Sequence, residues 1–319
     1  MGDKFLTPYE GSMAAADRCS LCQEPAVIRG REQAERWCAS HLITRLEDRV
    51  RGHIRESSLI SPGDHVAVAL SGGKDSTALL LILTTLLPEW KDVSISAITV
   101  DEGIAGYREE TIESAVRLTR QLGIRHSVLS FTDLFGKDLD TLLRKNGSRE
   151  RACSVCGVLR RRALSEAALR IGGTRVATGH NLDDEAQSVL MNILRGDLLR
   201  LVQDSSSGEP DCFIPRIKPL ARVTEKEVVA YLFVRDSYRE LPECPYAGSA
   251  LRSEIRTMLG DLEHRHPGTR EAIIRSQEKI RKQVPVRSSS EHIRSCRRCG
   301  ALSNGEICQA CRLLDSLGS

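Results

Sequence analysis

Strand-like and helix-like stretches alternate through the middle of this 319-residue chain. Four short apolar runs predict strands, at 65–70, 93–100, 126–131 and 174–179. Helical patterns follow these runs, at 75–87, 108–123, 156–171 and 182–196. Such alternation predicts an α/β fold, a doubly wound parallel sheet with helices on both faces. In a sheet of this kind a ligand binds at the carboxyl ends of the strands, so the residues that follow each run are candidates for chemistry.

The rest of the chain is expected to form smaller modules around this α/β core. Further helices are predicted at 41–56, 224–235, 249–262 and 268–283, and a flexible or inserted loop at 197–219. The expected division is a flexible leader at 1–18, an N-terminal zinc-binding module and helix at 19–58, the α/β domain at 59–220, a helical extension at 221–290 and a C-terminal zinc ribbon at 291–319.

The composition is that of a soluble globular protein, with 40% hydrophobic and 28% charged residues. The N-terminus has no signal-peptide pattern, and the longest apolar stretch, at 78–87, is too short to span a bilayer. We therefore predict a cytoplasmic protein. The net charge of +3 does not by itself indicate a nucleic-acid partner, although local arginine clusters permit one. These clusters are Arg160–Arg162, Arg195 with Arg200, and Arg294 with Arg297 and Arg298.

Ten of the eleven cysteines occur in metal-ligand patterns. A disulfide framework is a poor explanation, because a reducing cytosol would not keep it oxidised. Two sets have the spacing of tetrahedral zinc sites. The N-terminal set is Cys19, Cys22, Cys38 and His41. The C-terminal set, with two CxxC pairs, is Cys296, Cys299, Cys308 and Cys311. Cys212 has no evident role and is expected to be buried.

The segment SGGKDS, at 71–76, lies between the first predicted strand and its helix. Such a loop brings backbone N–H groups to a helix N-terminus, where the partial positive charge favours an anion. The glycines allow close approach of the backbone, Ser71 and Ser76 can donate hydroxyls, and Lys74 adds a positive charge. The loop lacks the spacing of a Walker A motif, so it predicts a phosphate-binding loop of another kind.

This loop resembles the pyrophosphate-binding loop, or PP-loop, of the N-type ATP pyrophosphatases, which transfer AMP to a carbonyl oxygen. Two stretches strengthen the resemblance: VDEGI, at 100–104, and TGHNLDDEAQ, at 178–187. One aspartate of the second stretch could merely stabilise a helix N-terminus. The resemblance implies an adenine-nucleotide α-hydrolase-like fold with ATP and Mg²⁺ as ligands. The implied ATP contacts are Ala69, Leu70, Ser71, Gly72, Gly73, Lys74, Asp75, Ser76, Val100, Asp101, Arg160, Gly179 and Asp184.

Three further cysteines narrow the chemistry. Cys153 and Cys156 lie at the start of the helix predicted at 156–171, and the doubly wound order is expected to place them at the same edge of the sheet as the phosphate loop. With Cys244 they make three thiolates, whereas structural zinc normally takes four protein ligands. Three thiolates on a [4Fe-4S] cluster would leave one iron free to bind something else.

Terminal zinc sites around an SGGKDS domain with a CxxC and a later lone cysteine resemble the tRNA 2-thiouridine synthetases, over nearly the whole chain. The stretch GHNLDDEAQSVLMNILRGD and the terminal CRRCG and CQACRLLDSL are most similar to the branch that modifies the wobble uridine, U34. The resemblance implies that the C2 oxygen of the uridine attacks the α-phosphate of ATP, and that sulfide on the cluster then displaces AMP. The implied catalytic residues are Lys74, Asp75, Asp183, Cys153, Cys156 and Cys244.

The same resemblance implies tRNA as a partner, a thiocarboxylated ubiquitin-like protein or free sulfide as the sulfur donor, and a possible homodimer. Several alternatives stay open. The product could be 2-thiouridine at U54 of the T loop, or 2-thiocytidine. Cys153 and Cys156 could act as a persulfide carrier and a resolving thiol without a cluster. Lysidine and NAD synthetases share the loop without needing the central cysteines, and a non-catalytic RNA-binding protein would explain only the zinc ribbons.

Overall fold

The computed structural model describes residues 18–30, 35–144, 151–202, 214–246, 251–284, 294–303 and 305–318. The predicted leader lies outside these residues except for Arg18, which forms an isolated bridge with Pro25. Cys212 also lies outside them, so its burial stays a prediction.

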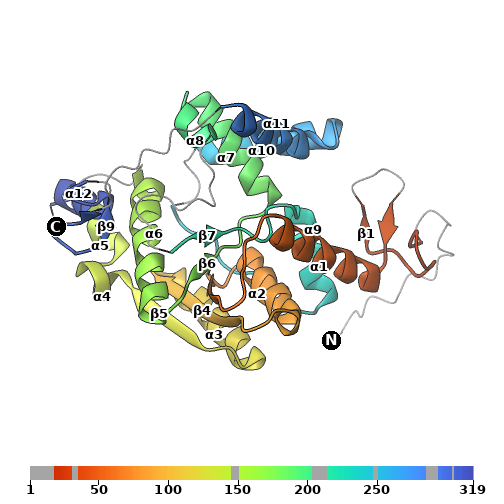
Figure 1. Cartoon of the computed structure of the whole chain (residues 1–319), viewed down its shortest axis with the longest axis horizontal. Helices are drawn as coiled ribbons and strands as arrows, with labels where there is room; N and C mark the ends of the chain where they lie inside the picture. The colour runs from red at the N-terminus through yellow and green to blue at the C-terminus, as the bar shows by residue number, and fades with distance from the viewer. Residues whose placement is uncertain are drawn as a thin grey trace, which may run out of the picture.

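Five parallel strands form the central sheet, in the order β5-β4-β3-β6-β7. They are β3 (His65–Ala69), β4 (Ser94–Asp101), β5 (His126–Ser130), β6 (Arg175–Ala177) and β7 (Arg216–Ile217). Figure 1 labels β4, β5, β6 and β7. The chain builds the sheet outward from β3 in both directions, which confirms the predicted doubly wound α/β fold. The prediction of a loop at 197–219 was wrong for Arg216–Ile217, which form β7. Two residues are too few for an alternating pattern, and β7 forms because it pairs with Val176 and Ala177 of β6.

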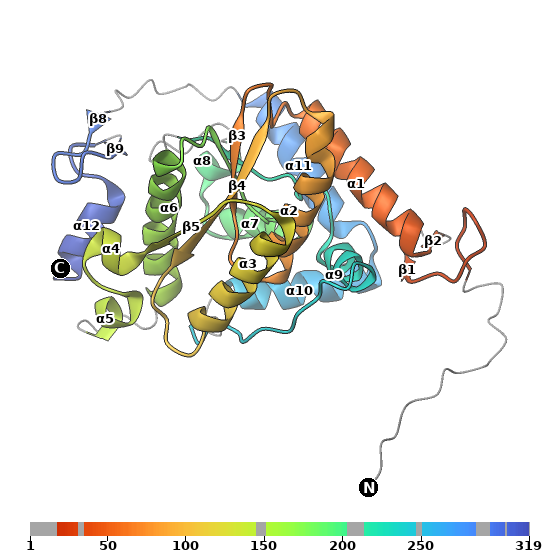
Figure 2. The same cartoon turned by 90° about the horizontal axis from the view of Figure 1, so that it is seen from below.

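Successive residues of β3 face two different cores, because side chains alternate between the faces of a sheet. Val66 and Val68 pack with helices α1 (Ala39–Glu56), α2 (Lys74–Leu86) and α9 (Glu225–Val234). Ala67 packs on the other face with α6 (Ala152–Arg170). Helix α3 (Arg108–Leu122) lies beside α2, and Figure 2 shows α6 on the opposite side of the sheet.

Helix α6 begins at Ala152, so the helix start predicted at 156 was wrong. Cys153 and Cys156 lie inside the helix, because the segment before 156 contains no helix breaker and Ala152, Val155 and Cys156 are buried together. Three short helices were also missed. They are α4 (Phe131–Phe135), α5 (Leu139–Arg144) and α8 (Leu198–Val202), the last again inside the predicted loop. Ser130 ends β5 and starts α4, because its hydroxyl oxygen accepts from the Asp133 N–H.

The helical extension consists of α9, α10 (Leu251–Arg265) and α11 (Thr269–Gln283), as predicted within a few residues. Helices α10 and α11 pack against α7 (Leu182–Leu194), the helix that follows β6. This packing matters for the site, because it brings arginines of the extension to the start of α7. No helix in the described ranges has the length and apolar character needed to cross a membrane.

The two cysteine-rich modules lie at opposite ends of the molecule (Figures 1 and 2). The N-terminal module pairs β1 (Ile28–Arg29) with β2 (Arg36–Trp37) and leads into α1. The C-terminal module pairs β8 (Arg294–Ser295) with β9 (Leu302–Ser303) and ends in α12 (Gln309–Ser316). Helix α12 packs against α6, so this module is anchored to the helix that carries the central CxxC.

Candidate active site

The phosphate loop joins the end of β3 to the first turn of α2. Gly73 is the N-cap of α2, and the Ser76 hydroxyl accepts from the Ser71 N–H at 3.1 Å and donates to the Gly73 carbonyl at 3.0 Å. Gly72 has φ +89°, and a Cβ there would lie 2.0 Å from the carbonyl oxygen of Thr111 in α3. Only glycine fits that place. The loop is thus closed on itself and presents a helix N-terminus at the carboxyl edge of the sheet.

The second motif meets this loop directly. Asn181 is the N-cap of α7 and forms a capping box with Asp184. The Asn181 amide also donates to the Asp75 carboxylate at 2.9 Å. A Cβ on Gly179 would lie 2.9 Å from the Asp75 carbonyl carbon. The structure therefore brings together two predicted site residues of this motif, Gly179 and Asp184, with the loop that lies about a hundred positions earlier.

Lys74 is held by two carboxylates. Its Nζ lies 2.8 Å from Asp75 and 2.9 Å from Glu225, the first residue of α9. Burial alone would lower the pKa of Lys74, but Asp75 and Glu225 more than offset this, so that its pKa is raised. Lys74 is therefore charged, and its ammonium group lies beside the phosphate loop between two carboxylates.

The Asp183 side chain is buried close to Glu225, one of the two partners of Lys74. Its carboxylate accepts from the Glu225 N–H at 2.8 Å and pairs with Arg270 of α11 at 2.9 Å. Burial raises the pKa of Asp183, and these two partners offset part of the effect. Asp184 lies 3.6 Å from Arg252 of α10, and burial raises its pKa as well.

Sequence reasoning missed Glu225, Arg252 and Arg270, which belong to the helical extension. Glu225 follows Thr224, whose capping box with Glu227 is a local signal for the start of α9 and gives no hint of a site. The arginines lie on amphipathic helices, where charge normally indicates a solvated face.

At the end of β4, the Asp101 carboxylate accepts from the Gly103 N–H at 2.9 Å, and the Val100 carbonyl accepts from Arg108 at 2.5 Å. These two predicted adenosine contacts lie beside the loop, because β4 is the neighbour of β3 in the sheet. Leu70 is joined to β4 by a hydrogen bond from its N–H to the Ile98 carbonyl.

The three central cysteines lie in one region, but their sulfurs are not all within 4.8 Å of one another, unlike the donors of the terminal sets. Cys153 donates to the carbonyl of Tyr246, two residues beyond Cys244, at 3.2 Å. Cys156 is buried and Cys244 half-buried in one apolar cluster. Burial raises the pKa of both thiols, and the neighbouring Cys244 raises that of Cys156 further. All three are free thiols.

Arg160, predicted to lie near the phosphates, contacts the cysteine site. Its Nη2 donates to the Cys156 sulfur at 3.0 Å, and its Nε lies 2.8 Å from Glu102. Burial alone would lower the pKa of Arg160, but Glu102 and Cys156 raise it. Glu102 was missed as a site residue although it lies in VDEGI; an acid directly after a strand would have been the signal.

The two terminal sets each bring four donor atoms within 4.8 Å of one another and could hold a metal ion. In the N-terminal set the Cys22 and Cys38 sulfurs are 3.6 Å apart, and the Cys38 sulfur lies 3.2 Å from His41 Nδ1. In the C-terminal set the Cys299 and Cys308 sulfurs are 3.7 Å apart. Two thiolates on a tetrahedral zinc, with bonds of about 2.3 Å, are about 3.8 Å apart. The donor geometry fits such an ion.

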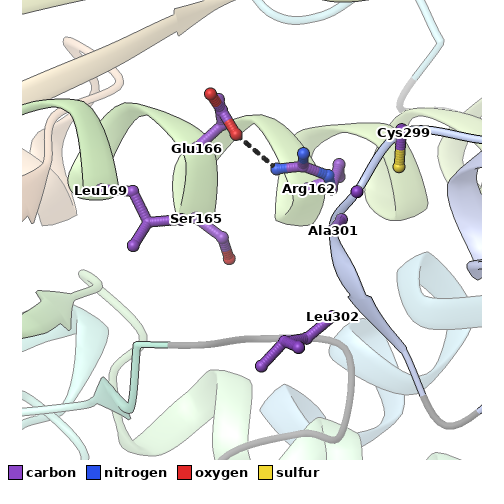
Figure 3. Close-up of a pocket in the computed structure, with 8 residues that line it drawn as sticks. Arg162, Ser165, Glu166, Leu169, Cys299, Ala301 and Leu302 are labelled. Carbon is purple, nitrogen blue, oxygen red and sulfur yellow. Dashed lines mark hydrogen bonds and ion pairs between the residues drawn. The ribbon is translucent and has the colours of Figure 1, made fainter. Parts of the chain in front are cut away.

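A groove of about 300 Å³ separates α6 from the C-terminal module (Figure 3). Its lining residues are Arg162, Ser165, Glu166, Leu169, Cys299, Gly300, Ala301 and Leu302. Arg162 and Glu166 form an ion pair of 3.0 Å on one wall. Cys299 of the C-terminal set lines this groove, but neither the predicted ATP contacts nor the central cysteines do, so the groove is separate from the phosphate loop and the cysteine site.

Several arginines of the predicted basic clusters form ion pairs within the chain. Besides Arg160 and Arg162, these are Arg200 with Asp197, Arg297 with Glu306, and Arg298 with Asp315. The carboxylate partners partly neutralise the charge of these arginines. Contact of the arginines with tRNA stays a prediction.

Known proteins are similar to this chain over nearly its whole length. Residues 43–245 match the PP-loop domain family. The chain is 36% identical over 316 residues to the tRNA 2-thiolation protein NcsA of Haloferax volcanii, covering 94% of this chain and 98% of that protein. It is 38% identical over 311 residues to the cytoplasmic tRNA 2-thiolation protein 1 of Bos taurus, covering 95% and 88%.

Among solved structures, the U34-tRNA thiolase NcsA from Methanococcus maripaludis with its [4Fe-4S] cluster has a TM-score of 0.81 and 32% identity to this chain. The match covers 95% of this chain and 97% of that one. The chain therefore belongs to the PP-loop family, in its group of tRNA 2-thiolation proteins.

Proposed function

We propose that this chain is an ATP-dependent tRNA sulfurtransferase that adenylates the C2 oxygen of U34 and replaces this oxygen with sulfur. One observation carries the proposal. Ion pairs of Arg160, Glu102 and Arg108 connect Cys156 to Ser71 of the phosphate loop. A phosphate site and a thiol site so closely joined suit a reaction in which one bound base is first activated and then receives sulfur. The printed names of the relatives support the same reaction.

In the first step, the C2 oxygen attacks the α-phosphorus of ATP, and pyrophosphate leaves. The N–H groups of loop 71–76 and the N-terminus of α2 would bind the pyrophosphate, and Lys74 would exchange Asp75 and Glu225 for phosphate oxygens. Mg²⁺ would balance the charge of the phosphates, since the carboxylates of Asp75 and Asp183 are ligands of the kind it prefers.

The remaining nucleotide contacts follow from the loop's neighbours. Ala69 and Leu70 at the end of β3, with Val100 and Asp101 at the end of β4, would line the adenosine. Gly179 and Asp184 would border the phosphates, since Gly179 packs on the backbone of Asp75. In the second step sulfide attacks C2, the C2–O bond breaks, and AMP leaves with the oxygen, which yields 2-thiouridine.

Cys153, Cys156 and Cys244 would hold a [4Fe-4S] cluster. They are free thiols that lie in one region, and the other described cysteines belong to the terminal sets. When bound, the cluster would supply an iron without a protein ligand, which can hold sulfide. The residues of this chain then have two tasks: to exclude water around the buried Cys156, and to keep the Arg160 guanidinium at its sulfur.

The terminal sets would each hold structural zinc, because four donors in tetrahedral spacing close the site. Both modules and the arginine clusters would contact tRNA, mainly through its phosphates. A thiocarboxylated ubiquitin-like protein or free sulfide would donate sulfur, and two chains would form a homodimer.

Since relatives are named cytoplasmic proteins, we propose the same location. We propose the division of the chain that the sequence predicts, with boundaries after residues 18, 58, 220 and 290.

The first test measures iron, acid-labile sulfide and tRNA thiolation on the same anaerobically purified samples. About four irons per chain are expected, and Cys244→Ala should lose both iron and activity. Full activity without iron would instead favour persulfide chemistry on Cys153 and Cys156. Transcripts with U34 or U54 replaced by cytidine identify the modified position. ATP-dependent release of pyrophosphate that requires tRNA would exclude a merely RNA-binding protein.

A further inference from the structure

A continuous series of charged contacts runs from the cysteine site to the phosphate loop. Arg160 Nη2 donates to the Cys156 sulfur at 3.0 Å, and Arg160 Nε lies 2.8 Å from Glu102 Oε1. The other oxygen of the same carboxylate, Oε2, lies 2.8 Å from Arg108 Nε. Glu102 thus stands between two guanidinium groups, one directed to each half of the site.

The far end of this series holds the loop itself. Arg108 donates to the Ser71 carbonyl at 3.2 Å and to the Val100 carbonyl at 2.5 Å. Its third partner is the hydroxyl of Thr111, at 2.9 Å, and the carbonyl of the same threonine lies against Gly72. A shift of Arg108 would therefore move the first residues of the phosphate loop.

Burial strengthens the electrostatic attraction between Glu102 and Arg108. Glu102 is 3% exposed and Arg108 4% exposed, so that their charges interact through protein and not through water. Without the carboxylate, the two guanidiniums would repel each other, and the buried one would have no counter-charge. The positions of Arg108 and Arg160 therefore both depend on Glu102, so that a movement of one arginine affects the other.

One contact inside the series, between Glu102 and Arg108, can be adjusted. Glu102 Oε2 and Arg108 Nε are close enough for an ion pair, yet neither atom has a hydrogen-bond partner, because the donor does not point at the oxygen. A small movement of the loop can improve or worsen this alignment. A contact of this kind is a physical means by which a ligand on the loop changes the position of Glu102, and with it that of Arg160.

We propose that Glu102 is a positioning residue that couples nucleotide binding on the loop to the setting of Arg160 against Cys156. By linkage, a group bound at the cysteines changes the affinity of the loop for nucleotide by the same factor. The inference rests on the proposed function, in which loop 71–76 binds ATP and the cysteines hold the sulfur-carrying group.

The test compares the full-length chain with Glu102→Gln, which keeps the shape of the side chain and removes its charge. The probe is AMP-PNP, and its affinity is measured by calorimetry. The electron paramagnetic resonance spectrum of the reduced cluster, with and without AMP-PNP, reports on the cysteine site. If the chain purifies without iron, the rate at which iodoacetamide alkylates Cys156, localised by mass spectrometry, replaces the spectrum.

In the wild type, AMP-PNP should change the spectrum, or change the alkylation rate by at least about fivefold. In Glu102→Gln, AMP-PNP should still bind, and the change at Cys156 should disappear. Glu47→Gln is the matched control. Glu47 is likewise buried and paired with an arginine, Arg235, but it lies between α1 and α9, away from both halves of the site. This control should respond like the wild type.

Arg160→Gln is a second variant that cuts the series at its half-exposed end, so the test does not depend on the folding of Glu102→Gln. At AMP-PNP concentrations that saturate its loop, this variant too should lose the response at Cys156. An equal response in the wild type and both variants would overturn the coupling and leave the proposed function intact. A wild-type chain that does not bind AMP-PNP would contradict the proposed function, and the coupling with it.

Discussion

The Asn181 amide donates to the Asp75 carboxylate over 2.9 Å, although the two residues lie 106 positions apart. Asp75 is in the first turn of α2 and Asn181 caps α7, so this one hydrogen bond joins the two helix N-termini that border the candidate ATP site. The two helices follow the adjacent strands β3 and β6. The contact thus depends on the strand order of the sheet.

Replacing Asn181 should separate its two roles. Asn181→Ala removes the cap of α7 and the bond to Asp75, and should lower the free energy of unfolding by about 1 kcal/mol and weaken ATP binding. Asn181→Ser can still accept from the Asp184 N–H but is too short to reach Asp75, so it should keep the stability and lose ATP affinity. Denaturant titration and calorimetry measure the two effects. Equal ATP affinity in all three proteins would contradict a role for the Asp75 contact.

Gly72→Ala should disrupt the phosphate loop. The position has φ +89°, and the added Cβ would lie 2.0 Å from a backbone oxygen, so the free energy of unfolding should fall by about 2 kcal/mol and ATP binding should be lost. Gly260→Ala is the control, since its Cβ meets no atom within 4 Å in the middle of α10. It should raise stability by up to about 1 kcal/mol. Thermal unfolding and ATP binding of both variants check this.

Acidification should destabilise the fold through His126. Burial lowers the pKa of this imidazole, whose Nε2 lies 2.7 Å from the Thr99 hydroxyl. Between the lowered pKa and the ordinary value of about 6.5, the unfolded chain binds more protons, so stability is present above about pH 6.5 and is lost as the pH falls. His126→Gln should flatten the decline in unfolding free energy between pH 7 and pH 5. An unchanged slope would show that His126 does not carry it.

Metal content should distinguish the terminal sets from the central cysteines. Cys308→Ser removes one of four clustered donors and should lower zinc from about two ions to about one per chain, with a lower melting temperature because the module around α12 loosens. Cys153→Ser should leave zinc unchanged and lower iron. Mass spectrometry of the metals in both variants gives the answer. Loss of zinc in Cys153→Ser would place a zinc ion among the central cysteines instead.

Much of the fold was predictable from local patterns. The strands at 65–70 and 126–131 and the helix at 108–123 are recovered within a residue, because alternation and amphipathic periodicity are encoded in neighbouring residues. Short elements were missed. Strand β7 has two residues and helix α8 five, and neither is long enough to show a period. The start of helix α6 was predicted at residue 156 and not at Ala152, because the CxxC motif does not by itself indicate a helix.

The α/β class follows from the alternation of strand and helix patterns along the chain, and the phosphate loop, the second motif and the two terminal metal-ligand sets follow from spacings within short segments. The fold, in contrast, brings together residues that are distant in the sequence: Asn181 with Asp75, Glu225 with Lys74, and Glu102 with both Arg108 and Arg160. These contacts are not predictable because ion pairs and hydrogen bonds act over about 3 Å. Whether two side chains come that close depends on strand order and helix packing, which no local pattern contains.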